Sequence, residues 1–166
     1  DGKKGIKVIP CYYKKDYPEW SDRGDGPGAP VAVHLPQSPI ISTGKRDGSK
    51  IRLPNGNYLE ETASYYVMIE TKTGGYTPAL ITMKSTQLNV SKKWNSMMKT
   101  IQIPDGKGGF AIPPMHGVVY NLASTLQKND KGSWYGWVVT QDRILGQKDK
   151  SLYLEAKDFS GNVSKG

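Results

Sequence analysis

Short stretches of alternating or continuous apolar residues dominate the chain and predict a mainly β protein. The predicted strands are a first strand over Ile6–Tyr13 that breaks and resumes at Val31–Leu35, followed by Thr62–Ile69, Ala79–Met83, Val118–Leu126 and Trp134–Thr140. Gly74-Gly75 separates the second strand from the third, and a polar run separates the fourth from the fifth. Each of these separators predicts a hairpin.

Two other segments repeat apolar residues at helical spacing instead. The stripes are Val90, Trp94, Met97 and Ile101 in the first segment, and Leu152, Ala156, Phe159 and Val163 in the second. Ser85 and Thr86 are suitable N-caps for the first helix, and Pro104 is expected to end it. We therefore expect a helix between the third and fourth strands, with Trp94 buried, and a short C-terminal helix weakened by Gly161.

Five strands with a helix between the third and the fourth is the order of an OB-fold barrel. The sequence thus favours a five-stranded OB-fold-like barrel with a short C-terminal helix. A β-sandwich would also accommodate these strands, but its usual set of about seven needs no helix at that position. All of residues 1–166 are expected to form a single domain, with long loops at about 21–30, 36–57 and 104–116.

The net charge of the protein indicates which class of partner it binds. The 23 Lys and Arg residues against 15 acids give a formal net charge of +8, which favours an anionic partner such as a phosphate backbone. The alternative is a basic protein whose charge only keeps it in solution. No apolar run approaches the roughly 20 residues that span a bilayer, so no membrane partner is expected.

Candidate catalytic chemistry is sparse. His34 lies in a predicted strand and His116 in a loop, and neither has a partner at the spacing of a nucleophile, base or metal set. Cys11 is the single cysteine, which excludes an internal disulfide, and its apolar strand predicts a buried, inert thiol. The sequence contains no P-loop and no dinucleotide-binding fingerprint. We therefore expect no catalytic residue, metal or cofactor.

Aromatic residues and cations instead recur side by side, as proteins that bind single strands require for base stacking and phosphate contacts. The candidate nucleic-acid-binding residues are Tyr13, Lys14, Lys15, Trp20, Arg23, Lys45, Arg46, Arg52, Tyr66, Lys84, Lys128, Lys131 and Trp134. Core packing is the competing interpretation for every ring. Alternation places Trp134 and Trp137 on opposite faces of the last strand, so we expect one in the core and Trp134 as the stacking surface.

Three segments of the chain resemble proteins of tailed bacteriophages. They are GIKVIPCYYKKDYPEW from Gly5, PALITMKSTQLNVSKKWNSMM from Pro78 and NDKGSWYGW from Asn129. The group they resemble is phage single-stranded DNA-binding proteins of the OB type. This resemblance implies a partner, single-stranded DNA with RNA left open, a role in phage DNA replication or recombination, and a location in the cytoplasm of the infected bacterial host.

The resemblance departs from that group at the C-terminus. Proteins of this class usually end in an acidic tail that recruits replication proteins, whereas this sequence ends Asn162-Val163-Ser164-Lys165-Gly166. Recruitment of phage replication proteins is therefore in doubt, and the sequence leaves a homo-oligomer open. The main alternative function is a β-rich virion structural or capsid-decorating protein.

Overall fold

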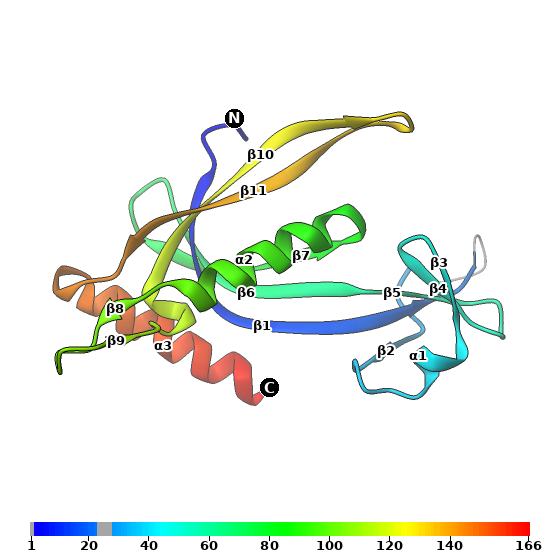
Figure 1. Ribbon diagram of the computed structural model, residues 1–166, viewed down its shortest axis with the longest axis horizontal. Coiled ribbons are helices and arrows are strands. Elements are labelled where there is room, and N and C mark those ends of the chain that lie inside the picture. The colour runs from blue at the N-terminus through cyan, green and yellow to red at the C-terminus, as the bar shows by residue number, and fades with distance from the viewer. Residues whose placement is uncertain (1, 23–27) are drawn as a thin grey trace.

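One long strand, β1 (Ile6–Trp20), runs through most of the computed structural model, which describes residues 2–22 and 28–166 (Figure 1). β1 is interrupted by a register shift between Pro10 and Tyr12, a β-bulge. Proline has no N–H for the ladder, and bulges are among the few places in a strand that tolerate it. The bulge reverses which side chains face each side of the sheet.

Within the described residues, nine strands form one curled sheet, and β1 joins its two parts. The other eight are β2 (Ala32–His34), β3 (Lys45–Asp47), β4 (Lys50–Arg52), β5 (Tyr58–Glu60), β6 (Thr62–Glu70), β7 (Tyr76–Lys84), β10 (Val118–Asn129) and β11 (Gly132–Ile144). The beginning of β1 pairs with β10, its middle pairs with β6, and its end pairs with β2 and β5. β7 follows β6 through a turn in which Gly74 adopts a φ of +84°, and β11 follows β10 in a second hairpin.

The remaining elements are helical apart from one small hairpin. They are α1 (Ile40–Thr43), η1 (Ser85–Gln87), α2 (Leu88–Thr100), β8 (Ile103–Pro104), β9 (Phe110–Ala111), η2 (Met115–Gly117), η3 (Gln147–Asp149) and α3 (Lys150–Lys165). In Figure 1 the β10–β11 hairpin rises from one end of the sheet and reaches back above α2, while β2 to β5 lie at the other end. We call residues 123–138 of the β10–β11 hairpin the arm.

Helix α2 covers one face of the sheet, the inner face. Trp94 is 0% exposed there. Its ring stacks on Tyr65 with the centroids 4.3 Å apart, and Tyr120 meets it edge-on at 5.6 Å. Aromatic pairs in these geometries add to the free energy gained from burial alone. The largest apolar cluster of the protein is thus centred on the helical stripe that the sequence predicts.

Helix α3 covers part of the opposite, outer face. Val8 belongs to the cluster under α2, whereas its neighbour Ile9 packs with Cys11 and Ala156 of α3. Successive side chains of a strand point to opposite faces, so both sides of β1 are buried here. Burial raises the pKa of the Cys11 thiol to about 12, as expected of an inert cysteine. We call β1, β6, β7, β10, β11, α2 and α3 the body.

A small lobe, residues 28–60, is inserted between β1 and β6. Its apolar cluster consists of the buried Tyr17 of β1, Ile51, Leu53 and Leu59, with the partly buried Ile40 and Ile41 packed against them. Tyr17 lies near the end of β1, so the lobe packs directly against the strand that precedes it.

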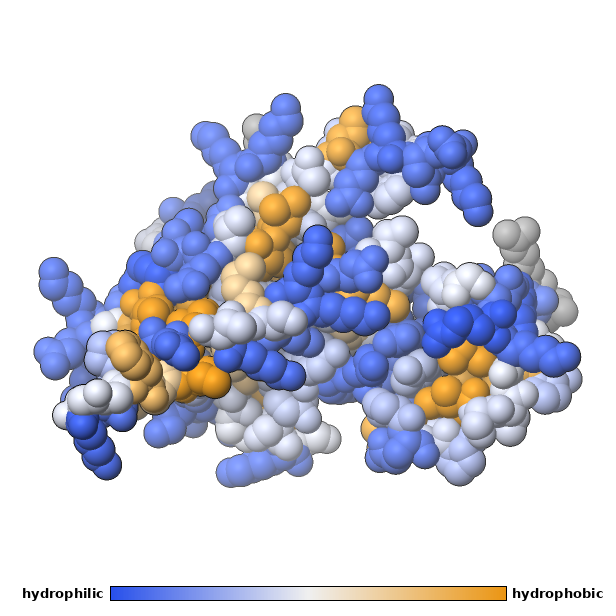
Figure 2. All heavy atoms as spheres, viewed as in Figure 1, coloured by the Kyte–Doolittle hydropathy of each residue, from blue (hydrophilic) through white to orange (hydrophobic). Residues whose placement is uncertain are grey.

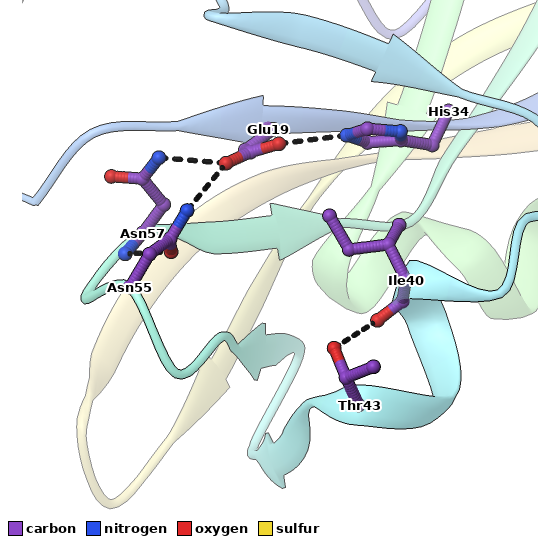
Figure 3. Close-up of polar contacts among 6 residues, drawn as sticks. All are labelled: Glu19, His34, Ile40, Thr43, Asn55 and Asn57. Carbon is purple, nitrogen blue, oxygen red and sulfur yellow. Dashed lines mark hydrogen bonds and ion pairs between the residues drawn. The ribbon is translucent and has the colours of Figure 1, made fainter.

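A polar network ties the lobe to β1 (Figure 3). Glu19, 5% exposed, bonds His34 Nε2 at 2.7 Å and accepts hydrogen bonds from the side-chain amides of Asn57 at 2.7 Å and Asn55 at 3.2 Å. These bonds, from Asn57 first and then from His34, hold the pKa of Glu19 below its ordinary value despite its burial. Helix α1 ends nearby, where the Thr43 hydroxyl donates to the carbonyl oxygen of Ile40.

The architecture confirms a mainly β protein with a C-terminal helix and corrects the prediction of five strands. Residues 36–57, predicted as a loop, contain α1, β3 and β4. Their strands have only three residues each, too short to produce a pattern of alternation. The 104–116 loop likewise contains β9.

Two further local predictions are wrong. Val31–Leu35 does not continue the first strand, because β2 folds back antiparallel and pairs Val33 with Pro18. Ser85 and Thr86 do not cap α2. They form a 3₁₀ turn in which Ser85 adopts a left-handed φ of 53°, and Gln87 takes the N-cap position without a side-chain cap.

Candidate nucleic-acid interface

A groove of about 290 Å³ lies on the outer face, where the sheet meets the lobe. Side chains two residues apart in β1 line it, because alternate positions of a strand share a face. Short strands of the lobe and the β6–β7 hairpin supply its other walls. The lining residues of this outer groove are Lys14, Asp16, Pro18, Trp20, Val33, Glu60, Thr62, Ser64, Thr82 and Lys84.

Strand register explains how these side chains come together. Lys14 pairs with Ser64, which in turn pairs with Thr82 on β7. One step along, Asp16 pairs with Thr62, and Thr62 pairs with Lys84. Directly opposite residues share a face, so two rows of polar side chains that cross three strands line the groove.

The charges of the outer groove form two ion pairs. Lys14 Nζ lies 3.4 Å from Asp16 Oδ2, and Lys84 Nζ lies 3.0 Å from Glu60 Oε2. The ammonium side chains are 44% and 51% exposed, whereas the carboxylate side chains are 10% and 13% exposed. Partial burial works against the charge of Lys14, but Tyr66 and Asp16 outweigh it and raise the pKa of the ammonium. The cations thus stand at the rim and the acids at the floor.

Aromatic rings lie next to both cations. Lys84 Nζ is 6.0 Å from the ring centroid of Trp20, at the limit of a cation–π contact. The indole Nε1 of Trp20 is buried and has no hydrogen-bond partner among the residues that the structure describes. Lys14 Nζ is 5.9 Å from the ring of Tyr66, which itself contacts Tyr12. Four predicted site residues, namely Lys14, Trp20, Tyr66 and Lys84, therefore gather on this one face.

Two predicted residues of β1 lie on the opposite face. Tyr13 tilts against Tyr65 at 5.0 Å in the inner cluster, and it is half-buried. Lys15 pairs with Glu61 at 3.1 Å, and this hydrogen bond raises the pKa of Lys15. Neither side chain lines the outer groove, so the predicted β1 cluster divides between the two faces.

The predicted cations of the 36–57 loop lie in the lobe. Lys45 and Arg46 are exposed on β3. Arg52 of β4 is held between Asp22 at 3.2 Å and Asp47 at 3.3 Å. Arg23, also predicted, lies outside the described residues.

The last predicted group occupies the arm. Lys128 and Lys131 are exposed at its tip, which Figure 2 shows as hydrophilic and separated from the lobe by an open notch. Trp134 is half-buried, and within residues 2–22 and 28–166 its Nε1 has no hydrogen-bond partner. Trp137 packs against the inner cluster instead. The ion pairs found among the described residues include none of Lys45, Arg46, Lys128 and Lys131.

Sequence reasoning missed the floor of the groove. The unpredicted lining residues are Asp16, Pro18, Val33, Glu60, Thr62, Ser64 and Thr82. Alternation from Trp20 back through Pro18 and Asp16 to Lys14 was a usable signal, because it places these four residues on one face. The contributions of β6, β7 and the lobe carry no such local signal, since they depend on which strands pair.

Other chemistry is limited in the part of the chain that the structure describes. Residues 2–22 and 28–166 contain no group of three or more His, Cys, Asp or Glu side chains placed to hold a metal ion. Over the same residues, no helix is long and apolar enough to cross a membrane. His116 is half-buried beside Tyr153, and burial lowers its pKa.

Comparison with curated proteins and with solved structures gave no match. A family model described as Pam3 phage gp34-like protein matches residues 2–166. The phage origin that the three segments suggested is therefore confirmed, while the match does not bear on DNA binding. With nearly its whole length covered, the chain belongs to the family of Pam3 phage gp34-like proteins.

Proposed function

We propose that this protein binds single-stranded DNA and supports phage DNA replication or recombination. The observation that carries the proposal is the meeting of Lys14, Trp20, Tyr66 and Lys84 on one open sheet face. Bases stack on aromatic faces for about 1–3 kcal/mol each, and nearby ammonium groups contact the phosphates. Such contacts tolerate most sequences.

The order of the long strands supports an OB-like assignment. β1, β6 and β7 precede α2, and β10 and β11 follow it. In OB folds, oligonucleotides bind on the face of the second and third strands, between the loop after the first strand and the loop before the fifth. Here β6 and β7 supply that face, the lobe replaces the first loop, and the arm tip replaces the second. The nine-stranded sheet is then this arrangement with the lobe added.

Charge supports an anionic ligand as well. Lys45 and Arg46 on the lobe and Lys128 and Lys131 on the arm extend the positive surface away from the outer groove. These cations add to the net positive charge that would attract a single strand to the protein. Each phosphate neutralised releases counterions, so affinity depends steeply on salt.

A virion structural role is the second candidate, and one observation favours it. Leu126, Tyr135 and Val138 are 49%, 73% and 39% exposed on the arm, where they border a pocket of about 580 Å³. Exposed apolar patches of this kind often contact other proteins. A structural protein would purify with virus particles and would show no affinity for oligonucleotides.

Titration with oligo-dT, followed by the fluorescence of the four tryptophans at two salt concentrations, tests the proposal. We expect log K to fall against log salt with a slope of about −0.7 per phosphate contacted. Lys84→Gln should weaken binding and reduce that slope by about 0.7. Lys72→Gln is the matched control, because it removes the same charge from the exposed turn between β6 and β7.

Two results would overturn the proposal. Absence of measurable binding at low salt would favour the structural role. Equal weakening by Lys84→Gln and Lys72→Gln would show that net charge, and not the outer groove, attracts the DNA.

A further inference from the structure

The floor of the outer groove is unusual for a surface that contacts DNA, because two carboxylates lie in it. Asp16 is 7% exposed as a residue, and the Glu60 side chain is 13% exposed. Lys14 and Lys84 balance these charges, so the groove is close to neutral. Burying a carboxylate costs free energy, and placing it beside phosphates adds repulsion. A groove that binds only phosphates gains nothing from either acid.

We infer that the outer groove holds one nucleobase and selects bases with an exocyclic amino group, with Asp16 and Glu60 accepting hydrogen bonds from that group. This inference rests on the proposed function, because it names the base class that the same site prefers. Ionised carboxylates only accept hydrogen bonds, so their natural partners on a base are N–H groups.

The bases divide clearly by this criterion. Cytosine and adenine each present an exocyclic NH₂, and guanine presents its NH₂ next to a ring N–H. Acidic side chains are known partners of the cytosine amino group. Thymine and uracil present two carbonyl oxygens on either side of a single ring N–H, and these oxygens repel a carboxylate. The groove should therefore disfavour thymine and uracil.

The rim and the floor can act on different parts of one nucleotide. Lys14 and Lys84 are more than 40% exposed, so their ammonium groups can turn toward a phosphate at the rim. The carboxylates, held on the sheet at 10% and 13% exposure, stay at the floor. A base that donates hydrogen bonds to Asp16 and Glu60 replaces the contacts these acids lose when Lys14 and Lys84 turn away. Thymine, which presents carbonyl oxygens, does not replace them.

Trp20 completes the groove. Its ring lines the wall and offers a stacking surface for a base.

The test compares oligonucleotides of dT, dU, dC and dA of equal length at neutral pH and low salt. We expect dC and dA to bind about tenfold more tightly than dT and dU, the effect of one good discriminating contact. Oligo-dU is the internal control, because it lacks both the amino group and the thymine methyl group. If dU binds as tightly as dC, the methyl group decides the preference and the inference is wrong.

Two variants assign the preference to the floor. Asp16→Asn and Glu60→Gln should each reduce the dC-to-dT ratio toward one without weakening dT binding, because they remove the repulsion. Asp158→Asn, an exposed acid on α3, removes the same charge elsewhere and should keep the ratio. Circular dichroism checks the fold of Asp16→Asn, and the more exposed Glu60 carries the test if that variant is unfolded.

The possible results separate this inference from the proposed function. Equal affinity of wild-type protein for dC and dT overturns the inference and leaves single-strand binding intact. A preference that survives in a folded Asp16→Asn and in Glu60→Gln also overturns it. Failure to bind any oligonucleotide overturns the proposed function, and the inference fails with it.

Discussion

The body and the lobe of this protein are stabilised by different kinds of contact. The body has eleven buried residues in its main cluster, in which Trp94 of α2 stacks on Tyr65 at 0% exposure. The lobe packs around only three buried apolar residues of its own and Tyr17 of β1, and it is also held by Glu19, a buried carboxylate of β1 with three polar partners in the lobe. Apolar burial grows with the size of a cluster, so the lobe gains little from it. Its position depends more on hydrogen bonds, which are directional and sensitive to pH.

This difference matters for the outer groove, which lies where the two regions meet. β1 and the β6–β7 hairpin, both part of the body, supply Lys14, Asp16 and Lys84, while Val33 and Glu60 come from the lobe. A change that loosens only the lobe should therefore alter the groove without unfolding the sheet. Variants in each region test whether the lobe can be loosened while the body stays folded.

The largest effect is expected in the body. Trp94→Ala should lower the free energy of unfolding by about 3–5 kcal/mol, because it removes the ring that Tyr65 and Tyr120 contact. Urea denaturation measures the loss. Lys92→Ala, at an exposed position of the same helix, is the control and should change stability by less than about 0.5 kcal/mol. Equal effects of the two variants would contradict the central role of Trp94.

A smaller and local effect is expected in the lobe. Leu59→Ala empties the centre of a four-residue cluster and should cost about 2–3 kcal/mol. Amide hydrogen exchange should accelerate over residues 45–60 and remain slow in β10. Leu35→Ala, at a side chain that is 60% exposed, should leave exchange unchanged. Faster exchange throughout the protein would show that lobe and body unfold as one unit.

The polar network should make the lobe sensitive to acid. The pKa of Glu19 is lowered in the folded protein, so its contribution is present above the ordinary value of about 4.5 and is lost as pH falls through the lowered pKa. Glu19→Gln should cost about 1–3 kcal/mol at pH 7 and flatten the acid part of the stability profile. Melting temperatures from neutral pH down to acid measure this. Parallel profiles for wild type and variant would contradict a role for Glu19.

The smallest expected change in stability is that of a substitution at Trp134 in the arm. Trp134→Ala should weaken single-strand binding by about 1–3 kcal/mol, if this ring stacks on a base, and leave the melting temperature nearly unchanged. Trp137→Ala should do the reverse, because Trp137 packs against the inner cluster. Fluorescence titration and thermal melting of both variants measure the two effects. Intact binding by Trp134→Ala would remove the arm from the interface.

Much of the body could be predicted from local periodicity. The segments that became β6, β7, β10 and β11 alternate over many residues, and the stripe through Trp94 repeats at helical spacing. Both periods arise within one element, so they survive whatever the element later packs against. The buried thiol of Cys11 followed from the same reasoning.

The face of the sheet that each side chain occupies was harder to predict. The bulge in β1 explains why Tyr13 lies on the inner face and not in the outer groove. Strict alternation would place Val8 and Tyr12 on one face, but the shift between Pro10 and Tyr12 puts Tyr13 with Val8 in the inner cluster instead. A bulge inserts one residue and so reverses the alternation beyond it. Pro10 indicates a bulge nearby, but the sequence does not show at which residue the alternation of side chains reverses.

Local sequence pattern and composition were enough to predict which segments are extended, which are helical, that Trp94 is buried and that the protein is basic. These properties depend on neighbours along the chain or on composition alone. Tertiary structure decided that residues 28–60 form a lobe, and that Asp16, Glu60 and Thr82 share a groove with Lys14 and Trp20. Residues from distant segments come together only through strand pairing. The pairing register is set because it must bury the apolar side chains on both faces of the sheet at once.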